Sequence, residues 1–248
     1  NSKTYGTALA GGTGYADVTA TGLQNGETIG SVTVAYNDGE AATDAATTYI
    51  DAISVSDATG GTATLSNYNI TYATGDLTVH PKALTITANQ VNKAYGNSLS
   101  DGDGYTDFIS AGLANGESIG SVSVTYSGGK NDNDDAGTNS DSVVISNAVD
   151  GTFTISNYSV TYVPGDLVVD QKQLTVTGAS ASNKIYDGNT DATVSGATLT
   201  GILTFNTVQD DVSIQNHESG TFAQATVGSS INVTTAMTLT GAKAANYS

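Results

Sequence analysis

The sequence predicts an all-β fold, and three observations support that prediction. β-Branched Val, Ile and Thr are frequent, apolar and polar residues alternate in short runs, and Gly supplies 29 of the 248 residues. Branched side chains and alternation are typical of strands, and frequent Gly marks tight turns between them. Pro81 and Pro164 are the only prolines, and no long charged or single-residue run indicates disorder. We therefore expect the whole chain to fold.

Internal repetition divides the chain into three tandem units. The phrase GLQNGETIGSVTVAY at residues 22–36 returns as GLANGESIGSVSVTY at residues 112–126, in which GLxNGE is predicted to form a turn or one helical turn. At the same offset, SNYNITYATGDLTV at residues 66–79 returns as SNYSVTYVPGDLVV at residues 156–169. A more divergent third copy begins with NKIYDG at residues 183–188 and ends in NYS.

We name these units the first repeat (residues 1–80), the second repeat (residues 81–170) and the third repeat (residues 171–248). The joints are short, because DLTV or DLVV leads within a few residues into ALTITA or QLTVTG. A flexible linker would be longer and rich in Gly and Ser. We therefore expect three small β-sandwich-like domains, or β-grasp-like ones, joined stiffly in an elongated rod. The first repeat is expected to lack its first strand, and the third repeat to lack its last.

The pattern of the second repeat predicts six strands at the spacing of a sandwich or a partly open barrel. They are expected around Leu84 and over residues 105–109, 121–126, 142–148, 153–162 and 166–169.

The recurring phrase at residues 66–79 is predicted to be the closing β-hairpin of a repeat. Gly75 and Asp76 would form its turn, and alternate side chains would enter a small core. These core side chains are Tyr68, Ile70, Tyr72, Leu77 and Val79.

The charge balance excludes two classes of partner. Lys and Arg together number 7, Asp and Glu number 24, and the formal net charge is −17. A field of that sign repels phosphate backbones and anionic lipids, so we expect neither nucleic-acid binding nor membrane attachment. No apolar stretch is long enough for a membrane helix, so membrane insertion is not expected. The chain has no Cys, which excludes disulfides and thiolate chemistry.

No pattern of catalytic residues is found, and we predict that the protein is not an enzyme. His80 lies in a joint and His217 in the third repeat, and neither has a recurring Ser or Asp partner. The segments GGTGY and GDGY superficially match phosphate-binding loops, but strand-like sequence follows them and no helix-opening Lys is present. They are predicted to be turns. No organic cofactor is expected.

Acidic loops are the strongest candidates for metal binding. DGDGYTD places Asp101, Asp103 and Asp107 in one loop, where three carboxylates would suit a hard cation such as calcium. The first repeat has Gly11, Thr13 and Asp17 at these positions, so a solvated acidic loop is the simpler interpretation. The loop NDNDDAG at residues 131–137 allows the same two interpretations.

Recurring polar and aromatic residues suggest two further hypotheses. A Lys, an Asn and an acid at equivalent positions would suit an internal isopeptide bond, against which a hydrogen-bonded Lys and an Asn-capped turn are simpler. The tyrosines would suit sugar stacking, against which their strand alternation favours a structural role. The residues concerned are Lys3, Lys93, Lys184, Asn67, Asn157, Asn246, Glu27, Glu117, Tyr68, Tyr72, Tyr158 and Tyr162.

Several of these phrases together resemble a known group of domains. KxYG, GLxNGExIGSV and SNYx(I/V)TYxxGDLxV resemble the mostly-β, glycine-rich (MBG) repeats of bacterial surface proteins, and the third repeat, with NKIYDGNTDATVSG and LTGAKAANYS, is similar to the YDG domain. The resemblance implies a secreted or cell-surface bacterial protein, of the kind of adhesins and filamentous-haemagglutinin-like exoproteins. In such proteins these domains form stalks, and the resemblance brings no catalytic residues with it.

We therefore expect a structural stalk segment of a secreted bacterial adhesin, with neighbouring repeats of the same protein as its partners. One alternative is an extracellular filament subunit that forms a homopolymer by strand addition. The other is a module that binds glycan or protein, whose receptor on a host or cell surface the sequence does not identify.

Overall fold

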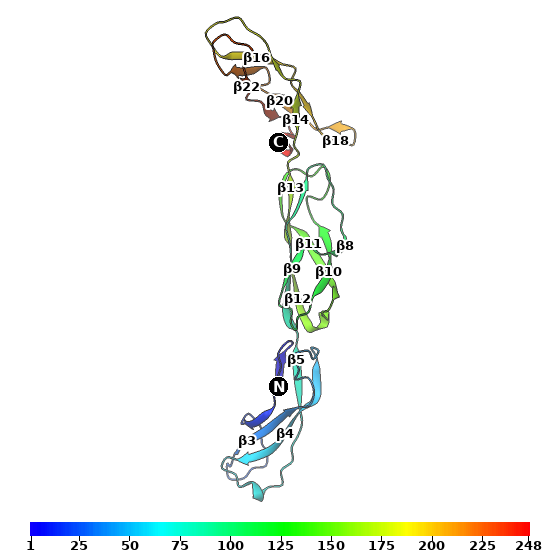
Figure 1. Cartoon of the computed structure of the whole chain (residues 1–248). Helices are drawn as coiled ribbons and strands as arrows, with labels where there is room; N and C mark the ends of the chain where they lie inside the picture. The colour runs from blue at the N-terminus through cyan, green and yellow to red at the C-terminus, as the bar shows by residue number, and fades with distance from the viewer. The chain divides into compact units, whose positions relative to one another are not determined.

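The computed structural model describes residues 1–248, except for the side chain of Asp150. It is almost entirely β, and its helical elements are 3-10 turns at η1 (Leu65–Asn67), η2 (Ile155–Asn157) and η3 (Ala244–Asn246) (Figure 1). The all-β prediction is thus confirmed. The described chain forms two compact units, which are presented separately: unit 1 comprises Asn1–Thr87, Asp103–Ser123 and Ile145–Val163, and unit 2 comprises Ala88–Gly102, Val124–Val144 and Pro164–Ser248.

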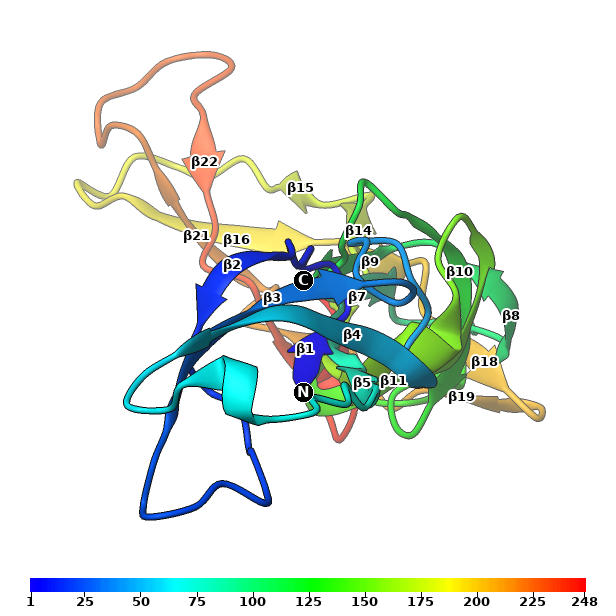
Figure 2. The same ribbon diagram turned by 90° about the horizontal axis from the view of Figure 1, so that it is seen from below.

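The first repeat is built on a five-stranded sheet of order β1-β5-β4-β3-β2. Its strands are β1 (Ser2–Thr4), β2 (Gly12–Tyr15), β3 (Ile29–Tyr36), β4 (Thr48–Gly60) and β5 (Gly75–His80). β1 pairs with β5 in parallel and the other pairs are antiparallel. Figures 1 and 2 show β3 and β4 as the long central pair. Val32, Leu77 and Val79 are buried because alternate residues of these strands face the same side.

Gly75 and Asp76 do not form a turn, as the sequence pattern predicted, but begin strand β5. Asp51 has a positive φ of 55°, and here the pairing of β4 with β5 shifts its register. The carboxylate of Asp76 accepts a hydrogen bond of 3.0 Å from the backbone N–H of Asp51. In the second repeat the carboxylate of Asp166 accepts a hydrogen bond of 3.0 Å from the backbone N–H of Asp141. The recurring Asp therefore satisfies a donor that a β-bulge releases from the ladder.

The second repeat contributes a five-stranded sheet of order β7-β13-β11-β10-β8 and a three-stranded sheet of order β12-β6-β9. The strands are β6 (Lys82–Ala88), β7 (Val91–Ala94), β8 (Gly102–Tyr105), β9 (Phe108–Ala111), β10 (Ile119–Tyr126), β11 (Gly137–Gly151), β12 (Tyr158–Val163) and β13 (Gly165–Asp170). The prediction missed β7 and merged β8 with β9. β6 is the central strand of its sheet, which explains why Leu84 and Ile86 are almost fully buried.

The predicted closing hairpin is wrong. β12 pairs in parallel with β6, from Tyr158 opposite Lys82 to Val163 opposite Thr87. β13 pairs in parallel with β7 and antiparallel with β11. Pro164 alone separates β12 from β13, which is too short for the two-residue turn of a hairpin. β12 and β13 therefore belong to different sheets and do not pair with each other.

In the first repeat the corresponding segment, residues 68–74, is not a strand at all. Leu77 and Val79 are buried as predicted, with exposed fractions of 0% and 2%. Ile70 and Tyr72 are 38% and 41% exposed, so their assignment to the core was wrong. Alternation identified the side of the chain on which these residues lie but not whether anything covers them.

The glycine-rich segments predicted as turns are the short strands β2 and β8. Gly14 and Gly104 have φ values of 84° and 80°, and the pairing of β2 with β3 shifts its register between Gly12 and Tyr15. The glycines thus form irregularities in edge strands, where bulges are frequent.

The third repeat consists of short strands in small sheets. The pairings are β14 with β17, β18 with β19, β20 with β23, and a four-stranded sheet of order β15-β16-β21-β22. The bounds are β14 (Thr175–Thr177), β15 (Ser180–Ala181), β16 (Asp191–Ser195), β17 (Thr198–Thr200), β18 (Thr204–Phe205), β19 (Val208–Gln209), β20 (Ser213–Gln215), β21 (Ser219–Phe222), β22 (Val233–Thr234) and β23 (Thr238–Thr240). In unit 2, Tyr95, Val169, Val212 and Tyr247 form one apolar cluster.

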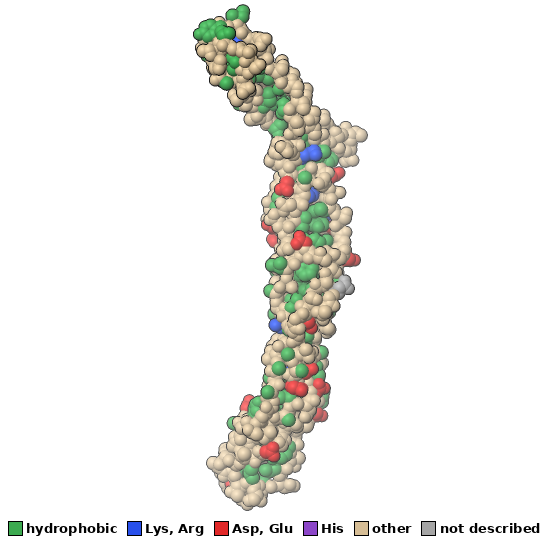
Figure 3. Space-filling view, in the orientation of Figure 1, with side chains coloured by type: hydrophobic (Ala, Val, Ile, Leu, Met, Phe, Trp, Pro, Cys, Tyr) green, Lys and Arg blue, Asp and Glu red, His purple; other side chains and the backbone are tan. Residues whose placement is uncertain are grey.

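On the face drawn in Figure 3, acidic side chains are scattered over the first and second repeats, and few are seen on the third repeat. No helix within the described chain is long and apolar enough to cross a membrane.

Candidate structural site: two tyrosine–carboxylate junctions

The first junction joins side chains of the first and second repeats within unit 1. Tyr5 donates a hydrogen bond of 2.6 Å to Oε1 of Glu117, and Tyr158 donates a short one to Oε2 of the same carboxylate. The two tyrosine rings meet edge to face, with centroids 5.4 Å apart. Tyr5 is 3% and Tyr158 6% exposed. Both oxygens of one carboxylate are therefore held by phenols from consecutive repeats.

The GLANGE phrase places Glu117. Asn115 and Gly116 both have positive φ, as a type I′ turn requires, and the N–H of Glu117 closes the turn on the carbonyl of Ala114 at 2.9 Å. The N–H of Ala114 donates to the hydroxyl of Tyr158 at 2.9 Å. The turn thus positions Glu117 for its contact with Tyr158, and Tyr158 holds the start of the turn at Ala114. Asn-Gly precedes the acid because these two residues readily adopt the positive φ that the turn requires.

The KxYG phrase places the other tyrosine. The N–H of Tyr5 donates to the carbonyl of His80 at 2.9 Å, which ties the Tyr to the last strand of its own repeat. Gly6 has a φ of 86°, and a Cβ added to it would lie 2.7 Å from the Cβ of Ala114. A side chain at this position would collide with the second repeat, so the Gly that follows the Tyr allows the close approach.

The second junction repeats this arrangement in unit 2, between the second and third repeats. Tyr95 and Tyr247 donate hydrogen bonds of 2.8 Å and 2.6 Å to the same oxygen of Asp210. Their rings again meet edge to face at 5.4 Å, and Phe205 packs edge to face on Tyr95 at 5.7 Å. Tyr95 is 1% and Tyr247 2% exposed.

Asp210 replaces the Glu of the GLANGE phrase, and sequence comparison missed it. The N–H of Leu203 donates to the hydroxyl of Tyr247, as that of Ala114 does to Tyr158. The N–H of Asp210 then closes on the carbonyl of Leu203 at 3.0 Å. Between these two residues the third repeat inserts the β18–β19 hairpin. The carboxylate of Asp210 therefore occupies the position equivalent to that of Glu117, although more residues precede it. A comparison of the repeats at a constant sequence spacing does not detect this equivalence.

A recurring Asn adds a second contact across each junction. Oδ1 of Asn157 accepts a hydrogen bond of 2.9 Å from the N–H of Ala46, and Oδ1 of Asn246 accepts one of 2.8 Å from Ala136. Asn246 also donates to Asp135 at 2.8 Å. Asp135 forms an ion pair with Lys243 at 2.5 Å, and this contact lowers the pKa of Asp135. Each Asn thus binds a loop of the preceding repeat.

The surroundings keep the phenols protonated. Burial raises the pKa of Tyr158 to about 12, and its hydrogen bond to Glu117 acts in the same direction. Burial and the contact with Asp210 raise the pKa of Tyr247 to about 12 as well. The pKa values of Tyr5 and Tyr95 are raised for the same reasons. A phenolate beside a carboxylate would be repelled, so the junction requires neutral phenols.

These pKa values predict loss of stability at alkaline pH. In the unfolded chain a Tyr ionises near pH 10, so the stabilisation is complete below that pH and is lost as pH rises toward 12. Each buried Tyr with a raised pKa contributes a fall of about 1.4 kcal/mol per pH unit within this window. Denaturant unfolding between pH 8 and pH 12 measures the effect. The Tyr158→Phe and Tyr247→Phe variants are expected to show a smaller dependence, and an unchanged slope would contradict the assignment.

The first repeat contains a tyrosine–carboxylate pair that corresponds to the pair of Tyr158 and Glu117. Tyr68 donates a short hydrogen bond to Glu27 and accepts one of 3.1 Å from the N–H of Gln24. At the other end of the pattern, Tyr186 stands where Tyr5 and Tyr95 stand in their repeats, and it is 64% exposed. Tyr5 and Tyr95 are both buried against the carboxylate of the repeat that follows their own.

The lysines and asparagines considered for an isopeptide bond have other partners. The ammonium of Lys3 donates to the carbonyl of Ala41, and that of Lys93 donates to the carbonyls of Asn97 and Asn131. Burial lowers the pKa of both lysines. Asn157 and Asn246 instead contact the preceding repeat, and Asn67 is exposed. The described contacts therefore favour the simpler alternative, hydrogen-bonded lysines.

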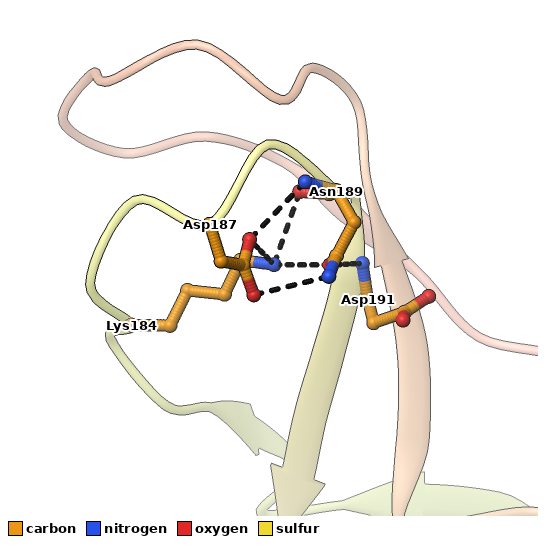
Figure 4. A network of polar contacts seen from close by, with 4 residues as sticks. All are labelled: Lys184, Asp187, Asn189 and Asp191. Atoms are coloured by element: carbon orange, nitrogen blue, oxygen red, sulfur yellow. Dashed lines mark hydrogen bonds and ion pairs between the residues drawn. The ribbon is translucent and has the colours of Figure 1, made fainter.

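Lys184, the third lysine of the set, lies in a polar network at a loop of the third repeat (Figure 4). Its ammonium is 2.9 Å from Asp187 and donates to the carbonyl and Oδ1 of Asn189. Oδ1 of Asn189 also accepts a hydrogen bond of 2.9 Å from the N–H of Asp191. The ion pair lowers the pKa of Asp187. These contacts close the YDG loop before β16 begins.

The candidate calcium ligands have separate surroundings. Asp101 forms an ion pair of 2.8 Å with Lys130 and accepts a hydrogen bond from the N–H of Tyr126. Asp103 accepts one of 2.5 Å from Ser123, and Asp107 is exposed. Among the described residues no group of three or more His, Asp or Glu side chains is arranged to hold a metal ion. Calcium binding remains a hypothesis, to which these contacts lend no support.

The histidines and the remaining tyrosines have local contacts. His80 is exposed, and a ring nitrogen of His217 lies 3.1 Å from the carbonyl of Ile214. The hydroxyls of Tyr72 and Tyr162 each accept a hydrogen bond of 2.9 Å from a backbone N–H, of Ala58 and Ala148 respectively. All four tyrosines considered for sugar stacking therefore have hydroxyls engaged with their own protein.

The comparison with protein families identifies one domain of the chain. Residues 170–248 match the YDG domain, which confirms that part of the resemblance. Neither the curated proteins nor the solved structures gave a match.

Proposed function

We propose that the chain is a structural stalk segment of a secreted bacterial surface adhesin, in which tandem β-domains provide length and stiffness. The observation that supports this proposal is the repeated junction. Two tyrosines and a carboxylate meet at the joint between consecutive repeats, once around Glu117 and once around Asp210. A domain array that served only to collect binding sites would not need the same buried contact at every joint.

The chemistry of the junction suits a joint that transmits tension along the chain. Hydrogen bonds to a charged acceptor are stronger than those between neutral groups, and burial from water strengthens them further. Edge-to-face rings add about 0.5–1.5 kcal/mol per pair beyond the area that they bury. Only Pro81 separates β5 from β6, so the connection between the first and second repeats is too short to allow large changes in the angle between them. Each joint thus combines a short connection with a directional polar contact.

Location and partners are part of the same proposal. A strongly acidic chain without Cys suits a bacterial protein outside the cell, stabilised by β-structure rather than disulfides. Its partners would be the neighbouring repeats of the same protein, and no catalytic role is proposed. Residues 170–248 match the YDG domain. This match agrees with the resemblance of the first two repeats to MBG repeats, because the resemblance implies that both kinds of domain occur in bacterial surface proteins.

Distance measurement across the first junction tests the stalk role. The chain has no Cys, so Ser66→Cys and Thr106→Cys introduce two labelling sites in exposed positions of consecutive repeats within unit 1. Paired nitroxide labels are expected to give one narrow distance distribution. Glu117→Ala is expected to broaden it, whereas Glu27→Ala, which removes the equivalent carboxylate inside the first repeat, is not. A broad distribution in the chain with an intact Glu117 would contradict a stiff joint.

Two other roles stay open as alternatives. A glycan- or protein-binding module would need exposed aromatic rings grouped on one face, and the exposed Tyr72 and Tyr186 belong to different units. A filament subunit that assembles by strand addition would need a sheet edge for the added strand, and β2 is an edge strand of the sheet in the first repeat.

A further inference from the structure

The second junction contains a charged contact whose counterpart in the first junction is uncharged. Oδ1 of Asp135 accepts hydrogen bonds from Nζ of Lys243 at 2.5 Å and from Nδ2 of Asn246 at 2.8 Å. Asp135 belongs to the second repeat, and both donors belong to the third repeat. Two side chains of the third repeat therefore converge on one carboxylate oxygen of the repeat before it.

The loop that carries Asp135, residues 131–136, has the same internal contacts as residues 41–46 of the first repeat. In each loop the first N–H donates to an Asp carboxylate three residues later, at 2.6 Å in the first repeat and 2.7 Å in the second. The carbonyl of the same first residue accepts a hydrogen bond from the buried Lys of the KxYG phrase. The residues of these contacts are Ala41, Asp44 and Lys3 in the first repeat and Asn131, Asp134 and Lys93 in the second. Ala45 therefore occupies in its loop the position that Asp135 occupies in the other.

The turns that face these loops also correspond. Thr154 is the N-cap residue of η2, and Lys243 is the N-cap residue of η3. The carbonyl of each accepts a hydrogen bond from the N–H of the Asn three residues later, at 2.9 Å for Asn157 and 3.0 Å for Asn246. The second repeat thus presents an uncharged Thr to the loop before it, where the third repeat presents a Lys.

The uncharged contact beside this position is the same in both junctions. Oδ1 of Asn157 accepts a hydrogen bond of 2.9 Å from the N–H of Ala46, and Oδ1 of Asn246 accepts one of 2.8 Å from the N–H of Ala136. The Asn contact therefore does not distinguish the second repeat from the third as the partner of a loop, whereas the charged contact does.

We propose that Asp135 and Lys243 determine which kind of repeat the second repeat binds next. Through this pair the second repeat binds a repeat with Lys at the N-cap of its last turn more strongly than one with Thr at that position, such as Thr154. Specificity is a difference between the affinities for competing partners, and hydrogen bonds between charged groups are stronger than those between neutral ones. The inference rests on the proposed function, because it treats the contact as a joint between consecutive repeats.

Hydrogen exchange of one backbone amide in each junction tests the inference on the full chain. Lys243→Met keeps the length of the side chain and removes its charge. It is expected to raise the exchange rate of the Ala136 amide by about two- to fivefold, the range of a partly exposed ion pair. The Ala46 amide, which makes the equivalent contact in the first junction, is expected to keep its rate. An unchanged rate at Ala136, or an equal increase at both amides, would overturn the inference.

Transfer of the pair into the first junction is the stricter test. Ala45 and Thr154 are both exposed, so the Ala45→Asp and Thr154→Lys substitutions do not disturb the core. The double variant is expected to slow exchange of the Ala46 amide by about two- to fivefold, and by more than the two single variants together. Salt at about 1 M is expected to remove most of this gain, because it screens exposed charges. Additive single effects, or no slowing in the double variant, would contradict a selective pair.

Failure of the stalk role and failure of this inference have different results. Flexible joints would give a broad label distance across the first junction and unprotected Ala46 and Ala136 amides in the chain without these substitutions, and they would overturn both proposals. Protected amides whose exchange does not respond to Lys243→Met or to the transferred pair would overturn this inference and leave the stalk role in place.

Discussion

Replacing Tyr95 with alanine is expected to lower the free energy of unfolding of unit 2 by about 3–5 kcal/mol, as for other large buried aromatic residues. Tyr95 is 1% exposed and contacts Tyr247, Phe205 and the carboxylate of Asp210. Its removal leaves a cavity among these rings and deprives Asp210 of one donor. Tyr95→Phe keeps the ring and loses only the hydrogen bond, so its expected cost is smaller, about 1.5–3 kcal/mol.

Tyr186→Ala is the matched control for this prediction. Tyr186 occupies the same place in its own repeat but is 64% exposed, and surface substitutions usually change stability by less than about 0.5 kcal/mol. Circular dichroism during urea unfolding gives the overall change, and hydrogen exchange at β13 and η3 places it at the junction. If Tyr95→Ala and Tyr186→Ala cost the same, the contact with the following repeat does not stabilise the chain.

The sequence was informative about local pattern within one repeat, although not about which strands pair. The pattern of the second repeat predicted a strand over residues 121–126, and β10 covers them, with Val122 and Val124 0% and 6% exposed. Repetition indicated which residues matter: Glu117, Asn157 and Tyr158 were all noted because they recur. What repetition did not give is their partners, since Tyr5 and Ala46 belong to the preceding copy. A residue that recurs once per repeat is equally compatible with a contact inside the repeat and a contact between repeats.

Two errors have physical causes of the same kind. The hairpin prediction treated β12 and β13 as partners because they are adjacent in sequence, whereas the partners of both are the distant strands β6 and β7. Asp210 was missed because the β18–β19 hairpin lengthens the chain before it without moving the carboxylate from Tyr247. Local pattern predicts which segments are strands, and the pairing between them depends on burial that only the folded chain displays.

The repeat pattern predicts an opening strand before residue 1 of the first repeat, and attaching the opening strand of the second repeat at that position tests this prediction. The nine residues KALTITANQ, placed directly before Asn1, have the same position relative to β1 as residues 82–90 have to β7. We expect residues 68–73 to become a strand and the thermal midpoint of the first repeat to rise. Burial of the added Leu and Ile contributes about 1.5–3 kcal/mol each, which the entropy of ordering the added residues opposes. A net gain of 1 kcal/mol would raise the midpoint by roughly 4–8 °C.

A second fusion with Asp in place of the added Leu and Ile separates burial from mere lengthening of the chain. It is expected to leave the midpoint and the hydrogen exchange of residues 68–73 as they are without any fusion, because the apolar side chains of Ile29, Val32 and Val55 beside that segment do not accept a carboxylate. Equal stabilisation by the two fusions would mean that burial of the added Leu and Ile plays no part. Stabilisation by the apolar fusion alone, with new protection at residues 68–73, is the result that the repeat pattern predicts.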